Sequence, residues 1–558
     1  MKIINNPTKY HTFIFEYQFD YEILEYCRWL KEQFGWKQFT FYDKAWRFSK
    51  PDIIEFIQAK YPNVELDDYS KNALETFHIE NKKSELIQET ALQLKKKTTS
   101  NIVVKGLKGE LYDFQKIAIE FLVNNNNRGL LALEMGLGKT FCSLGFIIYK
   151  KYKKILVVSP ASVKWSWESE TKKWTNLKPF VIGSKDELTI DVYNEYNVFI
   201  INYDILKKFY DKLSSLYWDC LILDESSFLK NPKTNRTKLS KMISKKVNSI
   251  ILLSGTPVLA KPVELFSQLN IIDPLKWGDY WEYVKKYCAP WSPPWGGINV
   301  SGASNIDELR EKIQQYVFRK RKEEVLDELP DKNFIDVPIE LNKDNAEMYR
   351  MLEDSFIEYL RMKGKNDKEI NKSLQAEALV KLNELRQLTS NGKIEAAKNV
   401  IQILLDNNDK LVVFSVYNEP LLKLKEDFKN KAVIIVGSTK DEDRKKAIED
   451  FQNNEEVRIF LGGMLSANTG ITLTASSNVL FIDYDWTPAN MEQAYSRIDR
   501  IGQKAKKINI IQLIAKNTID DRMKEIINIK KNIVDAIIEG KEVKKSQNAI
   551  SNLIKSYK

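Results

Sequence analysis

Short apolar runs alternate with longer amphipathic stretches from about Ile102 to the last fifty residues of the chain. Each run is followed by polar or small residues, which is typical of buried strands in a parallel sheet. A first series comprises residues 130–133, 155–158, 198–201, 220–223 and 250–253, and a second comprises residues 411–414, 432–436, 457–461, 479–482 and 508–513. The two series predict an α/β protein with two parallel-sheet domains.

The remaining segments carry other patterns. Strict alternation from Gln38 to Phe48 predicts a hairpin, flanked by two helical patterns, in an aromatic-rich start of the chain. Between the two strand series the strand signal disappears, which predicts a helical insertion. The predicted organisation is a small α+β module at 1–65, a helical linker at 66–101, a first α/β domain at 102–270, a helical protrusion at 271–390, a second α/β domain at 391–518 and a C-terminal helix or brace at 519–558.

Composition narrows the classes of function. A chain of 558 residues is too long for one core. Its formal net charge of +10 permits a polyanionic partner without requiring one. Four scattered cysteines and two histidines give no ligand spacing for zinc, so no zinc site is expected. No signal peptide or membrane span is recognisable, and we therefore expect a cytoplasmic protein without a membrane partner.

The first apolar run leads into EMGLGKT and then into a helical pattern, the order that a phosphate-binding loop requires. Gly136 and Gly138 leave backbone N–H groups free to face phosphate oxygens, Lys139 can reach the β- and γ-phosphates, and the Thr140 hydroxyl can ligate Mg²⁺. Leu133 stands where the usual pattern has its first glycine. The alternative is a glycine-rich turn without a ligand.

Two carboxylates follow the run at 220–223. Asp224 can hold Mg²⁺ through its water shell, and Glu225 can accept the proton of an attacking water. The alternative is a solvated strand end. Another run ends in Ser254-Gly255-Thr256-Pro257, which suits either a hinge that senses phosphate or a plain turn.

The second domain offers a pair of arginines. If residues 490–500 are helical, Gln493, Arg497 and Arg500 lie on one helix face, and two guanidinium groups can reach together into a cleft. Such a pair stabilises the charge that builds on a transferring γ-phosphate. A solvated basic helix face remains the alternative.

The ordered series LYDFQ, EMGLGKT, VVSPASVKWSWESE, INYD, DESS, LSGTP, VFSVYNE, GGMLSANTGITLTASSNVLF and QAYSRIDRIGQ resembles the motifs of Swi/Snf-type DNA translocases of superfamily 2. The insertion resembles the helical protrusion of that family. The resemblance implies two RecA-like lobes, ATP and Mg²⁺ as cofactors, adenine recognition by Gln115, phosphate and metal binding by Lys139, Thr140 and Asp224, water activation by Glu225, arginine fingers at Arg497 and Arg500, and Gly470 at the cleft. It implies DNA-backbone contacts around Ser159, Lys164, Asn202, Tyr203, Ser415 and Thr469.

Two positions depart from the family pattern. Ser227 replaces a histidine, and Leu133 replaces an acidic residue. Neither ligates metal or phosphate in this scheme, so hydrolysis is expected to survive, whereas the coupling of DNA binding to hydrolysis is left open.

The start of the chain sharpens the expected substrate. FDYEILEYCRWL and FYDKAWRF resemble the HARP-type module of annealing helicases, which implies direction of the motor to forks. Phe41, Trp46 and Phe48 suit either a packed core or a nucleic-acid platform. We therefore expect a monomeric DNA-dependent ATPase that anneals strands or regresses forks in duplex or forked DNA, with a role in DNA repair at a nucleoid or in a host cytoplasm. The alternatives are a motor that displaces proteins from DNA and a non-hydrolysing DNA-binding scaffold.

Overall fold

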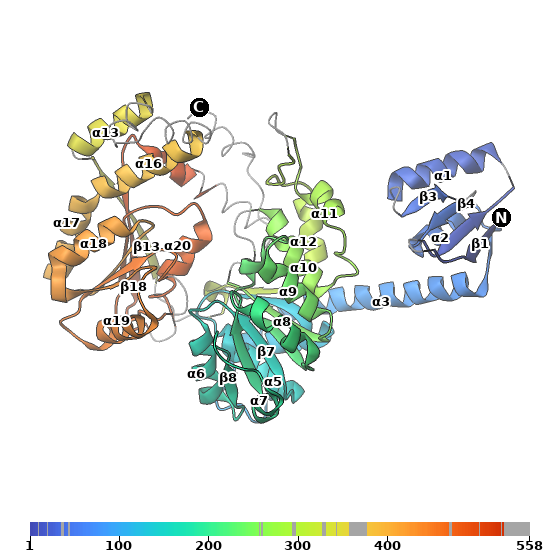
Figure 1. Ribbon diagram of the computed structural model, residues 1–558, viewed down its shortest axis with the longest axis horizontal. Coiled ribbons are helices and arrows are strands. Elements are labelled where there is room, and N and C mark those ends of the chain that lie inside the picture. Colours follow the sequence, from blue (N-terminus) through green and yellow to red (C-terminus); the bar gives the residue numbers. More distant parts are fainter. Residues whose placement is uncertain are drawn as a thin grey trace. The chain divides into compact units, whose positions relative to one another are not determined.

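Figure 1 shows the computed structural model of the chain, which describes residues 1–8, 11–18, 20–34, 38–42, 45–255, 257, 261–292, 297–325, 331–341, 343–355, 377–467, 471–500, 503–525 and 527–528. The chain divides into two compact units, Met1–Leu92 and Gln93–Lys558. The second unit contains two parallel sheets, each with its own helices. We call the seven-stranded sheet and its helices the first lobe, and the six-stranded sheet and its helices the second lobe.

The first unit is a small α+β module. Its sheet has the order β3-β4-β2-β1-β5, with β1 Lys2–Asn5, β2 Phe13–Glu16, β3 Phe39–Tyr42, β4 Ala45–Phe48 and β5 Glu65–Leu66. The predicted hairpin is confirmed, because β3 and β4 pair antiparallel. Helices α1 Tyr21–Phe34 and α2 Asp52–Lys60 flank the hairpin, and the long α3 Asp68–Lys96 follows them into the second unit.

The first lobe is a sheet of parallel strands only. Its order is β12-β6-β11-β10-β7-β9-β8, with β6 Arg128–Leu133, β7 Ile155–Ser159, β8 Pro179–Val181, β9 Val198–Asn202, β10 Cys220–Leu223, β11 Ser249–Leu253 and β12 Val317–Lys320. Its helices are α4 Asp113–Asn124, α5 Lys139–Lys150, α6 Lys164–Trp174, α7 Ile190–Glu195, α8 Leu206–Ser215, α9 Asn235–Ser244, α10 Phe266–Ile272, α11 Tyr280–Tyr287 and α12 Ile306–Ile313. Alternate residues of the strands, such as Leu130 and Leu221, pack with α8, α9 and α10 in one apolar cluster.

The second lobe is also entirely parallel, in the order β13-β18-β17-β14-β16-β15. Its strands are β13 Asp331–Ile339, β14 Leu411–Ser415, β15 Ala432–Ile435, β16 Ile459–Gly463, β17 Asn478–Phe481 and β18 Lys507–Ala515. Its helices are α13 Lys343–Asp354, α16 Glu377–Gly392, α17 Ile394–Asp406, α18 Asn418–Phe428, α19 Asp441–Asn453 and α20 Pro488–Tyr495. Val412 and Leu411 face opposite sides of the sheet, in two separate apolar clusters.

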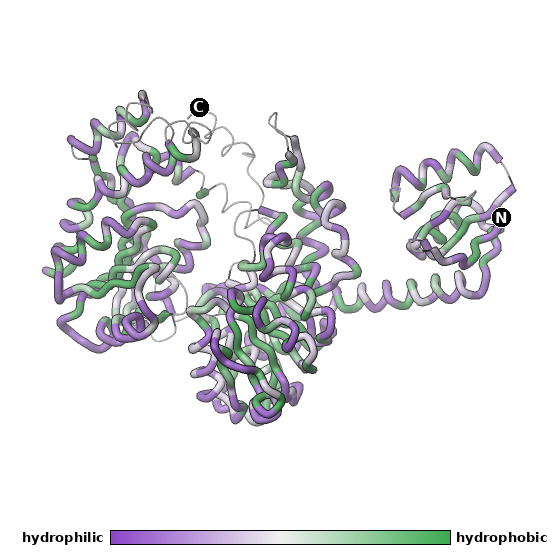
Figure 2. Tube along the Cα trace, viewed as in Figure 1, coloured by the Kyte–Doolittle hydropathy of each residue, from purple (hydrophilic) through white to green (hydrophobic). Residues whose placement is uncertain are grey.

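The hydropathy pattern explains why both sheets are central. In Figure 2 the strands of the lobes are hydrophobic and the outer turns of the helices are hydrophilic. All five residues of β7, β9 and β11 are buried, so these strands need helices on both faces. The predicted α/β fold class with two parallel-sheet lobes is confirmed. In the described part of the chain, no helix combines the length and apolarity that crossing a membrane requires.

Some expectations about the elements were wrong. The segment predicted to lack strands contains β12, which pairs with β6 at the edge of the first sheet, and β13, which pairs with β18 over nine residues at the edge of the second. β13 is half exposed and rich in charged residues, so it carries no apolar run. Of the predicted C-terminal helix, residues 519–525 are helical, and most of the remainder lies outside the described residues.

Candidate functional site

The predicted strand–turn–helix order is present at the edge where the strands of the first lobe end. β6 ends at Leu133 and α5 begins at Lys139. Gly136 has φ +91° and Gly138 has φ +74°, a left-handed conformation that glycine adopts without strain. A Cβ atom on Gly138 would lie 2.6 Å from Nε2 of Gln115, so a side chain has no room there. The turn is therefore a bare backbone cradle ahead of a helix N-terminus, the geometry that receives phosphate.

Gln115 is held against this turn from α4. Its Oε1 accepts a hydrogen bond from the backbone N–H of Tyr112 at 3.1 Å, and its Nε2 donates to the carbonyl of Leu137 at 3.0 Å. The side chain is buried. Its amide is thus fixed beside the phosphate loop, and its predicted contact with adenine stays a prediction.

Lys139 points back along the loop. Its Nζ donates to the carbonyl of Leu133 at 3.0 Å. Burial lowers the pKa of this ammonium, while the negative charges of Glu225 and Asp224 oppose that shift, so the three side chains share one site. The ammonium group has further N–H donors, which could bind an anion that enters the site.

Asp224 and Glu225 follow β10 at the same sheet edge. Oδ2 of Asp224 accepts from the indole Nε1 of Trp167 at 2.8 Å, and Oδ1 accepts from the backbone N–H of Glu225 at 2.8 Å. The Tyr203 hydroxyl donates to the backbone carbonyl of Asp224 at 2.8 Å. Asp224 is therefore held rigidly from three directions, which refutes the solvated strand end as an alternative.

Glu225 is placed differently. It adopts φ +45°, which is a strained conformation for a residue with a side chain. Its buried Oε2 finds no hydrogen-bond partner among the described residues. Burial raises the pKa of this carboxyl group, and the neighbouring Asp224 raises it further. A strained, unpartnered carboxylate with a raised pKa suits a proton acceptor.

The two arginines come from the second lobe. The helix predicted over 490–500 ends at Tyr495, so Gln493 lies on α20, whereas Arg497 and Arg500 lie in the turn that follows; the single-helix expectation was wrong. The turn still brings both guanidinium groups to the site. Nη2 of Arg497 lies 3.0 Å from Sδ of Met135 in the phosphate loop.

Arg500 approaches the same loop. Its Cγ would lie 3.4 Å from a Cβ atom on Gly136, and its Nη1 donates to the Thr472 hydroxyl at 2.9 Å. Burial lowers the pKa of both arginines, that of Arg500 to about 10, and the charge of Glu225 opposes the shift. Arg500 stays cationic at neutral pH, and the charge of Glu225 acts on both guanidinium groups. A solvated basic face is therefore excluded.

Sequence reasoning missed two supporting residues. Trp167 is fully buried on α6 and contributes the hydrogen bond to Asp224. Gln268 on α10 connects two motifs: its Oε1 accepts from the Ser226 hydroxyl at 2.7 Å, and its Nε2 donates to the carbonyl of Pro257 at 2.8 Å. A buried tryptophan next to the DNA-contact motif was a possible signal for the first, whereas nothing in the local pattern marks the second.

The residues predicted to contact DNA do not form one exposed set. Ser159, Tyr203 and Ser415 are buried. Their hydroxyls bond within the protein, that of Ser415 to Oδ2 of Asp483 at 2.6 Å. Asn202 is also buried, and Lys164 lies beside the ring of Trp165 at the start of α6. Any DNA contact at the buried positions would have to use backbone groups or neighbours. Thr469 and Gly470, together with Thr256 of the hinge motif, lie outside the described residues.

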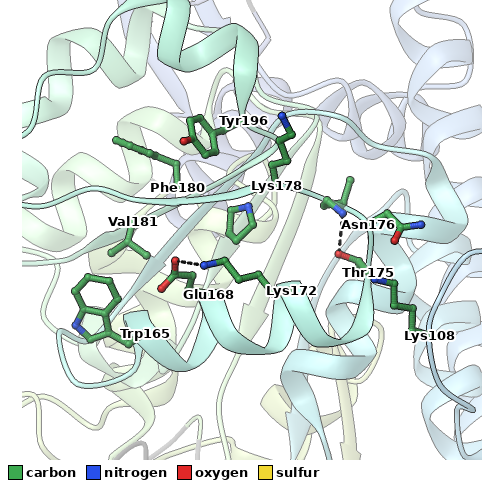
Figure 3. Close-up of a pocket in the computed structure, with 12 residues that line it drawn as sticks. Lys108, Trp165, Glu168, Lys172, Thr175, Asn176, Lys178, Phe180, Val181 and Tyr196 are labelled. Atoms are coloured by element: carbon green, nitrogen blue, oxygen red, sulfur yellow. Dashed lines mark hydrogen bonds and ion pairs between the residues drawn. The ribbon is translucent and has the colours of Figure 1, made fainter. Parts of the chain in front are cut away.

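A surface groove opens beside α6, between that helix and the edge strand β8. It has a volume of about 630 Å³. Figure 3 shows Lys172 and Lys178 with the rings of Trp165, Phe180 and Tyr196 around it. Lys172 pairs with Glu168 at 2.6 Å. The groove combines cationic and aromatic groups at the helix that begins with Lys164.

In the described residues, no group of three or more His, Cys, Asp or Glu side chains is arranged to hold a metal ion.

Comparison with known families decides the relationship. Residues 114–394, half of the chain, match the SNF2-related domain, and residues 392–502 match the helicase conserved C-terminal domain. This chain belongs to the SNF2-related family. The family predicted from the motifs is therefore confirmed, and both family matches fall within the second unit.

Several members of the SNF2-related family are similar in sequence. "DNA annealing helicase and endonuclease ZRANB3" of Homo sapiens is 30% identical over 455 residues, which cover 78% of this chain and 41% of the relative. "SWI/SNF-related matrix-associated actin-dependent regulator of chromatin subfamily A-like protein 1" of Xenopus tropicalis is 29% identical over 514 residues, which cover 90% of this chain and 52% of the relative. The chain thus spans about two fifths to one half of these relatives.

A solved structure, "Sulfolobus solfataricus SWI2/SNF2 ATPase core in complex with dsDNA", also matches the chain. It is 23% identical, with a TM-score of 0.39, and the match covers 79% of this chain and 99% of that structure.

Proposed function

We propose that this chain is an ATP-dependent DNA translocase that remodels duplex or branched DNA by annealing strands or regressing forks. One observation carries the proposal: Arg497 and Arg500 of the second lobe face Lys139 and Glu225 of the first lobe across the phosphate loop. A hydrolysis site divided between two lobes opens and closes once per nucleotide, which is how a motor converts hydrolysis into movement.

The residues of the site fit a nucleoside triphosphate. The backbone of Gly136–Gly138 and the Lys139 ammonium would hold its phosphates, and Gln115, which is held beside the loop, would contact the base. The Thr140 hydroxyl and the Asp224 carboxylate would hold Mg²⁺, which when bound neutralises charge on the phosphates. An acceptor set of carboxylate and hydroxyl oxygens suits this hard cation.

Hydrolysis then follows from positioned protein groups. Oε2 of Glu225 accepts a proton from the attacking water, because this oxygen is buried and has no partner among the described residues. The two guanidinium groups stabilise the negative charge that grows on the transferring phosphoryl oxygens. Both are desolvated, which strengthens that interaction.

DNA is the proposed track. The groove in Figure 3 combines Lys172 and Lys178 with exposed Trp165, and such combinations bind single-stranded nucleic acid by charge and stacking. The names of the relatives describe a DNA annealing helicase and a chromatin regulator, which supports a DNA-directed activity.

The chain carries four free, buried cysteines, which fit a reducing cytoplasmic compartment. We propose that the protein acts there as a monomer.

The test is phosphate release by the full chain with no DNA, single-stranded DNA, linear duplex and forked duplex. We expect DNA to raise the rate by about tenfold or more, with the fork as the strongest activator. Lys139→Ala and Glu225→Gln should each lower the stimulated rate by about 100-fold or more. Glu395→Gln is the matched control, because Glu395 lies exposed on α17. Equal release with and without every DNA would overturn the proposal.

A motor that displaces proteins from DNA uses the same hydrolysis site. A strand-annealing assay on a protein-free fork separates the two, because annealing without any protein obstacle requires the remodelling activity itself. The non-hydrolysing scaffold is disfavoured by the complete site, in which Lys139, Glu225 and both arginines meet.

A further inference from the structure

Four charged side chains form a cluster beside the phosphate loop: Glu134, Lys322, Lys332 and Asp499. Nζ of Lys322 lies 2.9 Å from Oδ2 of Asp499, and Nζ of Lys332 lies 3.3 Å from the same oxygen. Lys332 also lies 3.8 Å from Oε1 of Glu134. Lys322 is 1% exposed and Asp499 is 0% exposed. Two cations thus balance two anions: Glu134, Lys322 and Asp499 are buried, and the partly exposed Lys332 joins them from the surface.

The four residues come from both lobes. Glu134 begins the phosphate loop, and Lys322 lies just after β12, the strand that pairs with β6 of that loop. Lys332 lies on β13 at the edge of the second sheet, and Asp499 lies in the turn after α20. The cluster therefore spans the boundary between the lobes at the place where the candidate site closes.

Lys322, the most deeply buried lysine of the cluster, contacts both sides of that boundary. On the side of the phosphate loop, its backbone N–H donates to Oε2 of Glu134 at 2.9 Å, and its Cε would lie 3.2 Å from a Cβ atom on Gly136. On the other side, its Nζ donates to the backbone carbonyl of Asp499 as well as pairing with the carboxylate. One side chain thus touches the phosphate loop and grips a residue of the opposite lobe at two atoms.

Asp499 sits between the two arginines in sequence. Its backbone N–H donates to the carbonyl of Tyr495 at 3.2 Å, and the N–H of Arg500 donates to Ile498 at 3.2 Å, so the turn is short and tight. Fixing the carbonyl and the carboxylate of Asp499 therefore fixes where Arg497 and Arg500 emerge. Displacing Asp499 would move both guanidinium groups away from the loop.

We propose that Lys322 is a positioning residue that holds the arginine-bearing turn of the second lobe against the phosphate loop of the first. This inference rests on the proposed function, because it assigns the arginines to hydrolysis. Separation of the lobes would take Lys322 away from its carboxylate and leave Asp499 with Lys332 as its one partner in the cluster. The pair of Lys322 and Asp499 therefore favours the closed arrangement in which the arginines reach the phosphates. Lys322 holds the arginine-bearing turn in position and takes no part in the hydrolysis reaction itself.

Hydrolysis by variants of the full chain tests the proposal. Lys322→Met keeps most of the length of the side chain and removes its charge. With saturating forked DNA we expect kcat to fall by about 30-fold or more, while KM for ATP changes by less than about threefold. Lys322→Arg should recover at least part of kcat. Asp499→Asn should act like Lys322→Met, and the double variant Lys322→Met/Asp499→Asn should be no worse than the more affected single variant.

Lys393→Met is the matched control. Lys393 is also a fully buried lysine, and its Nζ bonds to the carbonyls of Ile482 and Leu513 and pairs with Asp520, away from the loop. This variant should lose thermal stability without the selective loss of kcat. A normal kcat in Lys322→Met, a rise in KM alone, or effects of Lys322→Met and Asp499→Asn that simply multiply would each overturn the proposal.

A second measurement needs no hydrolysis. Amide hydrogen exchange of residues 496–500 in the nucleotide-free chain should speed up in Lys322→Met and in Asp499→Asn, but not in Lys393→Met. Unchanged exchange in Lys322→Met would overturn the role of Lys322 even if the chain hydrolyses ATP. Failure of the wild-type chain to hydrolyse ATP would instead overturn the proposed function, while faster exchange would still support the Lys322 contact.

Discussion

The indole of Trp167 donates a hydrogen bond to Oδ2 of Asp224 across 2.8 Å, and both side chains are buried. The bond connects α6 with the acidic end of β10. It also lowers the pKa of Asp224, which burial raises. The hydrogen bond therefore favours the ionised form of Asp224 and fixes its orientation, and its donor comes from the helix that begins with the predicted DNA contact Lys164.

Trp167→Phe removes this donor while keeping most of the ring. We expect the Mg²⁺ concentration for half-maximal hydrolysis to rise by about tenfold, because a buried hydrogen bond to a charged group contributes roughly 1.5–3 kcal/mol. A titration of phosphate release against Mg²⁺ measures the shift. Trp218→Phe is the control, because its indole donates to the carbonyl of Leu213 elsewhere in the first lobe. An unshifted Mg²⁺ curve in Trp167→Phe would show that Asp224 does not bind the metal.

The raised pKa of Glu225 gives hydrolysis and stability opposite dependences on pH. As pH falls through that pKa, the carboxylate is protonated and the proton acceptor is lost. We therefore expect kcat to decline at a higher pH than about 4.3, the pKa of an exposed glutamate.

Stability depends on pH in the opposite way. A group with a raised pKa in the folded state favours folding when it is protonated, and that contribution is lost as pH rises through the folded pKa. Glu225→Gln should therefore be more heat-resistant than the wild type at neutral pH, with Glu395→Gln unchanged; a less stable Glu225→Gln would contradict this account.

Gln268 joins the acidic motif to the turn after β11, through Ser226 and Pro257. Ser227 stands where the family pattern has a histidine. We predict that the Gln268 connection carries the effect of DNA binding to the hydrolysis site in its place. Gln268→Met should reduce the stimulation of phosphate release by DNA by about fivefold or more. Ser267→Ala is the control, since the buried Ser267 hydroxyl has no hydrogen-bond partner among the described residues. Full stimulation in Gln268→Met would exclude the connection.

In the module at the start of the chain, the aromatic residues of the hairpin divide between the two roles that the sequence leaves open, a packed core and a platform for nucleic acid. Trp46 and Phe48 are 4% and 0% exposed and belong to the core, whereas Phe41 is 55% exposed on β3. Phe41→Ala should reduce the preference for forked over linear duplex in a phosphate-release assay while leaving the module folded. Phe48→Ala should unfold it, because deleting a buried phenylalanine costs about 3–5 kcal/mol. Unchanged fork preference in Phe41→Ala would remove Phe41 as a contact for nucleic acid.

Much of the fold follows from local pattern. The strands that meet the phosphate loop are continuous apolar runs, and β10 covers the residues predicted for it, 220–223. β13 was missed because its exposed residues include Asp331, Lys332 and Asp336, so no apolar run marks it, and only its pairing with β18 makes it a strand. The end of α20 was misplaced because nothing in the sequence from 496 to 500 breaks a helix, whereas Lys322 grips Asp499 in a turn.

The sequence also predicted the main residues of the candidate site, but not the contacts that hold them in place. Lys139, Asp224, Glu225 and the arginines were found because each motif has a chemical reason for its spacing. The buried state of Tyr203 and Ser415 was not, because a hydroxyl near a motif gives no sign that Asp224 or Asp483 already occupies it. Supporting contacts such as Trp167 and Lys322 depend on residues distant in sequence, and only the folded chain brings them together.

The central claim is that the second lobe supplies cations to a hydrolysis site on the first. The most direct measurement compares nucleotide binding with phosphate release in Arg497→Ala and Arg500→Ala, with forked DNA present. We predict that binding of a fluorescent ATP analogue stays within about threefold of the wild type while phosphate release falls by about 1,000-fold in at least one variant. Release at the wild-type rate in both variants would contradict the account.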